Sequence, residues 1–367
     1  MGLRSWGGVI LLVSCAGLLL VGPPLAADSK AWNAEYLQSD SDWPQVYPND
    51  VNERGKITGF WQGADGIHAI VWSDPDSAPA ELDALEGDTN NWAADVNGRG
   101  TVCGTSGGGW PLSRAVIWDG KNLIHDRQPA DWGYSDLWSL NESDEGAGSV
   151  WDDPASGWPF WACYWSAKGE AVVLDDGGCL STWAISINKN GRIAGQSYPD
   201  VAEPPFVRAC YWDRTSGDLV DVHDAVESAA GEDLYYTLAY EVTDDDEVVG
   251  FAYTLADFRM IAWVYSDDEG VTILDDGATG TAFAWQSAGK WVIGGIGGDP
   301  GFNGTPVAAV WERGTKKGTT TWTLHPITSL ADTEMIAVGV NKEGNLVGAA
   351  QAADGTVRAW YAKRAGK

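Results

Sequence analysis

Short apolar runs alternate with glycine-rich turns along this chain, and one such pattern recurs about seven times. A well-formed copy is Ile187–Gly195, I-N-K-N-G-R-I-A-G, followed shortly by Arg208–Trp212, R-A-C-Y-W. The first run predicts a β-hairpin, because Asn can bond to its own backbone and Gly supplies the positive φ that a tight turn needs. The second run predicts a strand that ends on an aromatic residue.

The other copies follow the same order, with a degenerate third hairpin and a sixth hairpin that has drifted. The hairpin recurs at Asp50–Gly59, Asp95–Gly104, Ser139–Gly148, Glu241–Gly250, Ser287–Gly294 and Gly339–Gly348. The strand recurs at His68–Trp72, Arg114–Trp118, Trp161–Trp165, Ile261–Tyr265, Ala308–Trp311 and Arg358–Tyr361. The aromatic residues that end the first six strands lie 46, 47, 47, 53 and 46 residues apart. Such regular spacing indicates a repeat architecture.

Each copy has room for four short strands, which is typical of a β-propeller blade. We therefore predict an all-β fold, a seven-bladed β-propeller of four-stranded blades that occupies residues 28–367 as one domain. The seventh copy ends before its fourth strand, and a strand-like Trp32–Leu37 precedes the first copy. We expect this N-terminal strand, within residues 28–45, to complete the last blade and close the ring. Helix is expected only as one or two turns within Ala225–Asp233.

The repeat also resembles a known family. Its consensus, A-x-x-I-N-x-x-G-x-I-V-G, then A-Φ-Φ-W, then L-x-x-G, is similar to the HAF repeat of bacterial extracellular proteins and covers roughly residues 46–362. The chain departs from that pattern at Trp161-Ala162 and Ile261-Ala262, where His-Ala or Arg-Ala is usual, and in the third and sixth hairpins. The resemblance implies a secreted bacterial propeller and assigns no catalytic residue.

The N-terminus points to export. Residues 1–27 carry Arg4, an apolar run through Val21, and P-P-L-A-A, which is typical of a secretory signal peptide. A lipoprotein anchored at Cys15 is the alternative, because L-V-S-C resembles a lipobox. No second apolar segment is visible, so we expect no transmembrane segment and a secreted, extracellular or periplasmic protein.

The charge balance is strongly acidic. Removal of the signal peptide leaves 22 basic and 52 acidic residues, which gives a net charge of −30. Such a surface repels nucleic acid and anionic membranes. It favours cations, basic partners or neutral sugars, and solvation alone is the alternative explanation. We expect a monomer whose partner is a glycan or a cell-surface or extracellular protein.

Four cysteines follow the signal peptide. Cys163 and Cys210 occupy equivalent places in adjacent copies, too far apart for a disulfide, and with Cys103 they are interpreted as buried packing residues. Cys179 lies in a loop and is expected to be the exposed one. Any disulfide connectivity among the four stays open.

Candidate binding residues are aromatic. The repeated Trp of A-Φ-Φ-W is expected to pack between blades, and Asn52, Asn97, Asn141, Asn188 and Asn341 are interpreted as hairpin residues. The loops on the face opposite the hairpins vary between copies, and variable loops on a rigid scaffold carry function. They contain flat side chains suited to stacking on sugar rings, and the alternative is that these side chains plug the channel. The candidates are Tyr47, Trp92, Trp138, Trp183, Trp285, Trp61, Trp110 and Trp158.

No cofactor is predicted. Asp175-Asp176-Gly177 and Asp275-Asp276-Gly277 are weak calcium candidates, because Asp-Gly is also ordinary turn chemistry and neither stretch matches an EF-hand loop. Zinc is disfavoured because the four histidines are scattered.

Three functions remain open. The first is a secreted, non-catalytic propeller whose aromatic and acidic loop face binds a glycan or a cell-surface partner. The second is a structural exoprotein without a small-molecule site. The third is a glycan-cleaving enzyme, which requires two converging carboxylates and at least one raised pKa.

Overall fold

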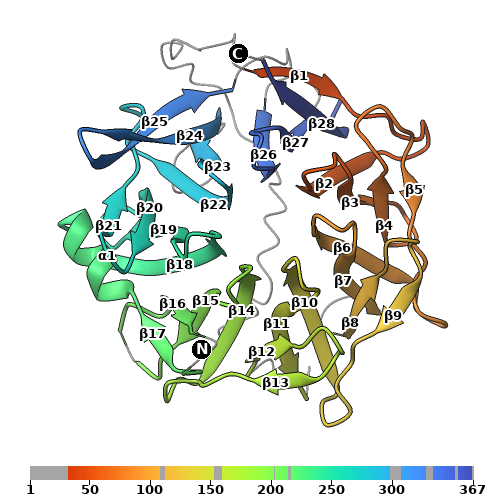
Figure 1. The fold of residues 1–367 in the computed structure, drawn as a ribbon, viewed down its shortest axis with the longest axis horizontal. Coiled ribbons are helices and arrows are strands. Elements are labelled where there is room, and N and C mark those ends of the chain that lie inside the picture. The colour runs from red at the N-terminus through yellow and green to blue at the C-terminus, as the bar shows by residue number, and fades with distance from the viewer. Residues whose placement is uncertain are drawn as a thin grey trace.

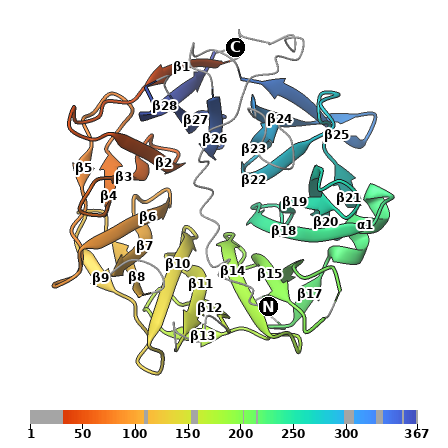
Figure 2. The same cartoon turned by 180° about the vertical axis from the view of Figure 1, so that it is seen from behind.

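The computed structural model describes residues 32–107, 112–152, 159–201, 203–213, 216–297, 307–327, 334–351 and 354–365. Within this part the chain forms 28 strands and one short helix, with the strands arranged radially around a central channel (Figures 1 and 2). The prediction of an all-β fold is confirmed. The predicted signal peptide, residues 1–27, and Cys15 lie outside the described residues.

We divide strands β2–β28 into consecutive units, six of four strands and a seventh of three, and number the units along the chain. Units 1 to 3 comprise β2 (Gln45–Val51), β3 (Ile57–Gln62), β4 (Ile67–Trp72), β5 (Ala80–Glu81); β6 (Asn90–Val96), β7 (Val102–Gly107), β8 (Ser113–Trp118), β9 (Ile124–Asp126); and β10 (Tyr134–Leu140), β11 (Gly146–Trp151), β12 (Trp161–Trp165), β13 (Ala171–Val173).

Units 4 to 6 comprise β14 (Ser181–Ile187), β15 (Ile193–Tyr198), β16 (Arg208–Trp212), β17 (Leu219–Asp221); β18 (Leu234–Val242), β19 (Val248–Thr254), β20 (Met260–Ser266), β21 (Gly270–Ile273); and β22 (Ala282–Ala288), β23 (Trp291–Ile296), β24 (Val307–Lys316), β25 (Thr319–Pro326). Unit 7 contains β26 (Glu334–Val340), β27 (Leu346–Gln351) and β28 (Val357–Arg364), and β1 (Trp32–Tyr36) pairs antiparallel with β28. In every unit the first of these strands lies nearest the channel (Figure 1).

The sheets only partly follow the predicted division. Units 2 to 6 are five separate four-stranded antiparallel sheets. Units 1 and 7 form one eight-stranded sheet, because β2 also pairs in parallel with β28 through Gln45 and Val357. Seven separate four-stranded sheets are therefore not present in the described residues, and this corrects the prediction.

The repeat glycine that closes the second strand has a steric reason. Each channel strand contains an irregularity in register near its middle, as between Ala93 and Asp95 in unit 2. There the channel strand approaches its neighbour so closely that a Cβ at Gly104 would overlap the carbonyl oxygen of Trp92. Gly195 faces Trp183 in the same way. Only glycine leaves room for this approach.

The repeated strand-end Trp packs between units, as predicted. Trp72, Trp118 and Trp311 are fully buried. In five units the indole N–H also donates to a backbone carbonyl 34–38 residues earlier, in the preceding part of the ring: Trp72 to Gln38 (2.8 Å), Trp118 to Asp83 (2.9 Å), Trp165 to Arg127 (3.0 Å), Trp212 to Asp175 (2.7 Å) and Trp311 to Asp275 (2.8 Å). Each contact satisfies the buried indole nitrogen and ties two units together.

The remaining expectations hold with small corrections. Cys103, Cys163 and Cys210 are buried, and Cys179 is partly exposed; all four are free thiols. The helix α1 (His223–Ala230) starts two residues before the predicted range and ends at Gly231, whose φ of 73° breaks it. No helix in the described part of the chain is long and apolar enough to cross a membrane.

Candidate functional site

Most of the predicted aromatic side chains meet in a ring around the channel. Trp138 packs edge-to-face between Trp92 (ring centroids 4.7 Å apart) and Trp183 (5.5 Å). Phe60 continues the ring from Trp92 (6.1 Å) to Tyr47 (4.9 Å). A second arc of units 5 and 6 contains Tyr240, Phe251, Phe283 and Trp285. We call these nine side chains the aromatic girdle.

Trp61 lies apart from the girdle. Its ring is stacked between Trp43, at 5.2 Å and an interplanar angle of 5°, and His68, at 4.3 Å and 12°. Its indole N–H donates to Glu81 Oε1 at 3.0 Å. These two side chains occupy stacking surface of Trp61 that a sugar ring would need, and Trp61 does not line the channel cavity described next. Trp110 and Trp158 lie outside the described residues.

A cavity of about 410 Å³ occupies the channel at the end where the hairpins turn. Trp92, Trp138, Tyr240 and Trp285 line its wall, and the hairpin residues line its mouth. This volume lies within the range of pockets that hold small ligands. The prediction looked for a ligand among the loops of the opposite face, and of the candidates there Tyr47, Trp61 and Trp183 do not line this cavity.

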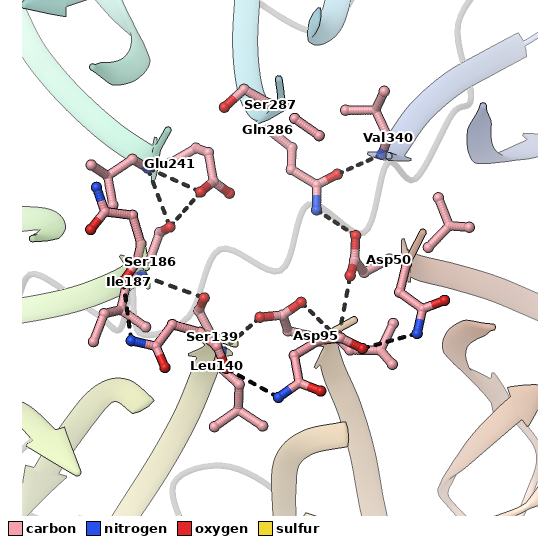
Figure 3. A pocket seen from close by; sticks show the side chains of 18 of the residues that line it. Asp50, Asp95, Ser139, Leu140, Ser186, Ile187, Glu241, Gln286, Ser287 and Val340 are labelled. Carbon is pink, nitrogen blue, oxygen red and sulfur yellow. Dashed lines mark hydrogen bonds between the residues drawn. The ribbon is translucent and has the colours of Figure 1, made fainter. Parts of the chain in front are cut away.

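Below the girdle, polar side chains of different units point toward one another across the channel (Figure 3). We call this ring the polar belt; its members are Asp50, Asp95, Ser139, Ser186, Glu241 and Gln286. Five of them accept a hydrogen bond from a backbone N–H of the next unit: Asp50 from Val96 (3.3 Å), Asp95 from Leu140 (2.7 Å), Ser139 from Ile187 (3.4 Å), Ser186 from Val242 (3.2 Å) and Gln286 from Val340 (3.1 Å). The belt therefore holds units together and faces the cavity at the same time.

The hairpin Asn residues form a second ring, which we call the Asn clamp. In five units the amide Nδ2 donates to a backbone carbonyl of the next unit: Asn52 to Asn97 (2.9 Å), Asn97 to Asn141 (3.0 Å), Asn141 to Asn188 (3.1 Å), Asn188 to Thr243 (2.8 Å) and Asn341 to Asn52 (3.2 Å). The Asn residues thus belong to the hairpins, as predicted, and also join neighbouring hairpins.

Both rings are interrupted between units 5 and 6. In unit 5 the carboxylate of Glu241 accepts a hydrogen bond from Ser186 Oγ of the preceding unit at 2.5 Å. It also accepts one from the N–H of Val242, the next residue in the chain, at 3.0 Å. Both contacts use Oε1, and no hydrogen bond from the described residues reaches Oε2. In unit 6 the buried hydroxyl of Ser287 has no partner among the described residues. We call this interruption the belt gap.

Some carboxyl groups in and beside the cavity have raised pKa values, whereas the pKa of Asp244 at the mouth is lowered because its contacts with Lys342 and Lys189 together outweigh burial. Burial raises the pKa of Glu241 to about 8, and burial raises that of Asp136, beside the girdle, to about 7. The pKa of Asp50 is raised well above its ordinary value by burial and by the neighbouring carboxylate of Asp95. The channel is thus a low-dielectric environment in which negative charge is poorly compensated.

The weak calcium candidates lie elsewhere and serve their own turns. Asp175 and Asp275 each accept an N–H bond from the second residue after them, Gly177 (3.3 Å) and Gly277 (2.9 Å). Asp176 and Asp276 do the same with Gly178 (2.7 Å) and Ala278 (2.8 Å). Within the described ranges no group of three or more His, Cys, Asp and Glu side chains could hold a metal ion.

Comparison with solved structures identifies the fold. An oligogalacturonate lyase in complex with manganese matches over 91% of this chain and 97% of its own, with a TM-score of 0.54 and 11% identity. YCF48 bound to D1 peptide matches over 93% and 97%, with a TM-score of 0.52 and 9% identity. The beta-propeller domain of the Trilobed protease from Pyrococcus furiosus matches over 88% and 96%, with a TM-score of 0.50 and 11% identity.

The fold is a β-propeller. At such low identity the likeness extends to the fold alone, and these neighbours include both enzymes and a peptide-bound protein. No protein-family model and no curated protein matches the chain. The resemblance to the HAF repeat therefore stays a prediction.

The polar belt was missed from the sequence, although a signal for it exists. Its members lie two residues before the hairpin Asn or its equivalent, as in D-V-N at Asp50 and Asp95 and S-L-N at Ser139. A polar residue at that point interrupts an otherwise apolar strand end in six of the seven copies. A position that is polar in nearly every copy of a buried strand indicates side chains that face the channel.

Proposed function

We propose that this chain is a secreted, non-catalytic β-propeller that binds a glycan in its central channel. The observation that carries the proposal is the channel cavity of about 410 Å³, which has aromatic walls and, nearer its mouth, a belt of carboxyl, amide and hydroxyl groups. Sugar rings present an apolar face that stacks on indole and a rim of hydroxyls that both donate and accept hydrogen bonds.

The polar side chains that line the cavity match that chemistry. Carboxyl, hydroxyl and amide groups of the polar belt face the channel from neighbouring units (Figure 3). No hydrogen bond from the described residues reaches Oε2 of Glu241, so this carboxyl can bond to a ligand hydroxyl. A hydroxylated ligand therefore fits better than an apolar one.

Charge and the N-terminal sequence support the rest of the proposal. A net charge of −29 for the whole chain disfavours nucleic acid as a partner. The resemblance to the HAF repeat and the signal-like residues 1–27 favour a bacterial secreted protein. We propose that it acts as a monomer on a glycan presented at a cell surface or in the surroundings.

We further propose that the ring has seven blades and is closed by its N-terminal strand. Support comes from β1, whose residues Trp32–Tyr36 pair in unbroken antiparallel register with Trp360–Arg364 of β28. Support also comes from Gln38, which follows β1 and accepts the indole N–H of Trp72, as residues that follow the outer strands do in other units. A single parallel pair joins units 1 and 7, so the eight-stranded sheet is readily divided into two blades.

A glycan-array screen of residues 28–367, followed by titration of any hit with tryptophan fluorescence, tests the binding function. Saturable binding that changes the fluorescence is expected. Trp92→Ala should weaken binding at least about tenfold by removing a cavity wall. The matched control Trp61→Ala removes an indole outside the cavity and should leave affinity unchanged. Binding that Trp61→Ala abolishes and Trp92→Ala spares would place the site on the outer loops.

A glycan-cleaving enzyme is the second candidate. It is favoured by the neighbouring carboxyls of Asp50 and Asp95, because the pKa of Asp50 is raised as a general acid requires. However, Asp50 is buried, and its two oxygens are engaged by Gln286 (2.8 Å) and Val96 (3.3 Å). Products released from any array hit during incubation would favour this candidate over binding alone.

A further inference from the structure

We propose that the face opposite the hairpins carries a second binding surface, at which units 4 and 5 dock a basic segment of a partner protein. Units 4 and 5 are neighbours in the ring (Figure 1). The surface is a cluster of four aromatic rings, none of which lines the channel cavity. We call it the outer platform; its members are Phe206, Tyr235, Tyr236 and Phe258. This inference is independent of glycan binding in the channel.

Three segments bring these rings together. Phe206 lies in the loop between β15 and β16, the two tyrosines lie at the start of β18, and Phe258 lies in the turn between β19 and β20. Strand β18 has nine residues, where the first strand of every other unit has seven. Since β18 ends at its hairpin as the others do, the two extra residues extend unit 5 at the opposite face. The loop of unit 4 is tied to this extension, because the N–H of Thr237 donates to the carbonyl of Val207 at 3.1 Å and Val207 pairs in parallel with Tyr236.

The outer platform is packed before any partner binds. Its central ring is Tyr235, with ring centroids 4.3 Å from Tyr236, 4.9 Å from Phe258 and 5.5 Å from Phe206. Tyr236 also contacts Tyr253 of β19, at 6.1 Å. A surface that is already ordered loses little conformational entropy on binding, which favours affinity.

The turn that carries Phe258 presents apolar side chains to solvent. Phe258 is 45% exposed, and Leu255 in the same turn is 42% exposed. Hydrogen bonds close the turn: the N–H of Thr254 donates to the carbonyl of Arg259 (2.9 Å), and the N–H of Phe258 donates to the carbonyl of Thr254 (3.2 Å). Phe258 has a φ of 57°, in a region that bulky residues rarely adopt. Neither the exposure nor this conformation stabilises the isolated protein, and a partner that covers the two side chains accounts for both.

The charge around the outer platform favours a basic partner. Five acidic residues and one basic residue lie in the three loops beside it, residues 199–207, 231–233 and 255–259. The basic residue, Arg259, already pairs with Glu232 and lies 4.0 Å from Asp257. The other three acidic residues have no basic partner within the described part of the chain: Asp200, Glu203 and Asp233. Lysine or arginine side chains of a partner would supply this counter-charge.

Other occupants are disfavoured by charge or by chemistry. A second copy of this chain, with its net charge of −29, would bring negative charge to an acidic surface, and so would nucleic acid or an anionic membrane. A sugar needs hydrogen-bonding groups beside the ring on which it stacks, but the exposed side chains of Leu255 and Phe258 are hydrocarbon. They suit an apolar side chain of a protein segment, flanked by lysine or arginine.

The test begins with a phage-displayed library of random twelve-residue peptides, selected against the full protein. We expect the enriched peptides to combine a large apolar residue with a net positive charge. Synthetic copies are then titrated by fluorescence anisotropy in low and in high salt. Their affinity should fall at least about threefold in high salt, because ions screen the attraction.

Variants locate the surface. Phe258→Asn replaces the exposed ring with a residue type that tolerates the same φ, and it should weaken the selected peptides at least about tenfold. If Phe258→Asn does not fold, Leu255→Asn tests the same turn and should weaken them at least about threefold. The matched control Leu123→Asn changes a leucine that is 57% exposed in unit 2 and should leave their affinity unchanged.

Four results would overturn the proposal. The first is a selection that enriches no peptide, and the second is one that enriches acidic peptides or peptides without an apolar residue. The third is equal affinity of the selected peptides for Phe258→Asn and the wild type, which would mean that they bind elsewhere. The fourth is a glycan hit that Phe258→Asn abolishes, which would make the outer platform a sugar site. Phe258→Asn is expected to leave any glycan bound in the channel unaffected, so the two proposals stand or fail separately.

Discussion

The hairpin next to the channel is built in two ways, and units 2 and 6 show the contrast. In unit 2 the turn contains three residues after Asn97, and the Asn97 side chain organises it. Its Oδ1 accepts the N–H groups of Arg99 and Thr101, both at 3.1 Å. Its Nδ2 donates to Asn141 of the next unit at 3.0 Å and to Asp144 at 2.7 Å. The Asn97 amide therefore uses both acceptor positions of its oxygen and both hydrogens of its nitrogen.

In unit 6, Ala288 takes the place of the Asn and the turn is shorter. Ala288 pairs directly with Trp291 across a turn of two residues, which the backbone closes without a side chain. The indole N–H of Trp291 then donates to Lys342 of unit 7 at 3.2 Å. Gln286 reaches past unit 7, whose belt position is Gly339, and donates to Asp50 of unit 1 at 2.8 Å.

The contrast shows that one ring can be held by two sets of contacts. A repeated amide joins five of the junctions, and a Trp, a Gln and a Lys replace it around unit 6. At the belt gap this replacement leaves Oε2 of Glu241 without a hydrogen bond from the described residues. The regular units are thus joined by one repeated contact, and the irregular unit is joined by several different ones.

The largest expected loss of stability comes from removing the hairpin Asn of a regular unit. Asn97→Ala removes four side-chain hydrogen bonds from a residue that is 4% exposed. It should lower the free energy of unfolding by about 3 kcal/mol, because buried backbone groups lose their partners. Urea unfolding of the variant measures this. The control Asn33→Ala removes an exposed amide and should cost less than about 0.5 kcal/mol. Equal losses would mean that the Asn clamp does not hold the ring.

The second effect concerns the belt position, which is an acid in unit 5 and an amide in unit 6. The pKa of Glu241 is about 8 in the folded protein, above its ordinary value of 4.5. Between these values the folded protein keeps a proton that the unfolded chain releases, so stability falls as the pH rises. Because Glu241 is partly exposed to the cavity, solvent screening leaves only part of the full linkage energy. In Glu241→Gln the loss between pH 5 and pH 8 should therefore be smaller by about 1–2 kcal/mol.

Thermal unfolding across that pH range, with Glu170→Gln as control, measures this second effect. The control removes a carboxyl from an exposed turn and should follow the wild type. A Glu241→Gln curve parallel to the wild type would mean that this carboxyl is ionised without penalty in the folded protein.

A smaller effect tests the ion pair that spans unit 6. Lys342 of unit 7 lies 3.0 Å from Asp244 of unit 5, and half of the Lys342 side chain is exposed. Lys342→Met should cost about 0.5–1 kcal/mol in low salt and almost nothing in high salt, because exposed ion pairs are weak and screened. The control Lys121→Met should show no such salt dependence. A loss that persists in high salt would mean that Lys342 acts by packing.

Much of the fold could be predicted from the sequence because its signals are local. Asn and Gly at fixed offsets specify the hairpins, and the period specifies the ring. The joining of units 1 and 7 through Gln45 and Val357 could not be predicted. It depends on how two chain segments more than 300 residues apart meet, and no periodicity contains that information.

Only part of the candidate site could be predicted from the sequence. Aromatic spacing led to Trp92, Trp138 and Trp285, which do line the cavity. It also led to Trp61, whose ring stacks on Trp43, from the segment before β2, and on His68 of the paired strand β4. Exposure of an aromatic ring depends on which side chain lies across from it, and that is a property of packing. The polar belt left a signal in the sequence, but its meaning depends on knowing that the strand faces a channel.

The smallest expected change in stability comes from adding an Asn to the irregular hairpin of unit 6. Ala288→Asn places the missing amide in unit 6. In unit 2 the amide oxygen serves the residues two and four positions later, but in unit 6 the fourth residue, Val292, is already paired with Ser287 in the sheet. The added amide therefore lacks its second donor, and Trp291 already bonds to unit 7. We expect a change in stability below about 0.5 kcal/mol by urea unfolding. A gain in stability of about 1 kcal/mol or more would show that an Asn at this position joins the units whatever the turn length. The belt gap would then result from the absence of this Asn and not from the shorter hairpin.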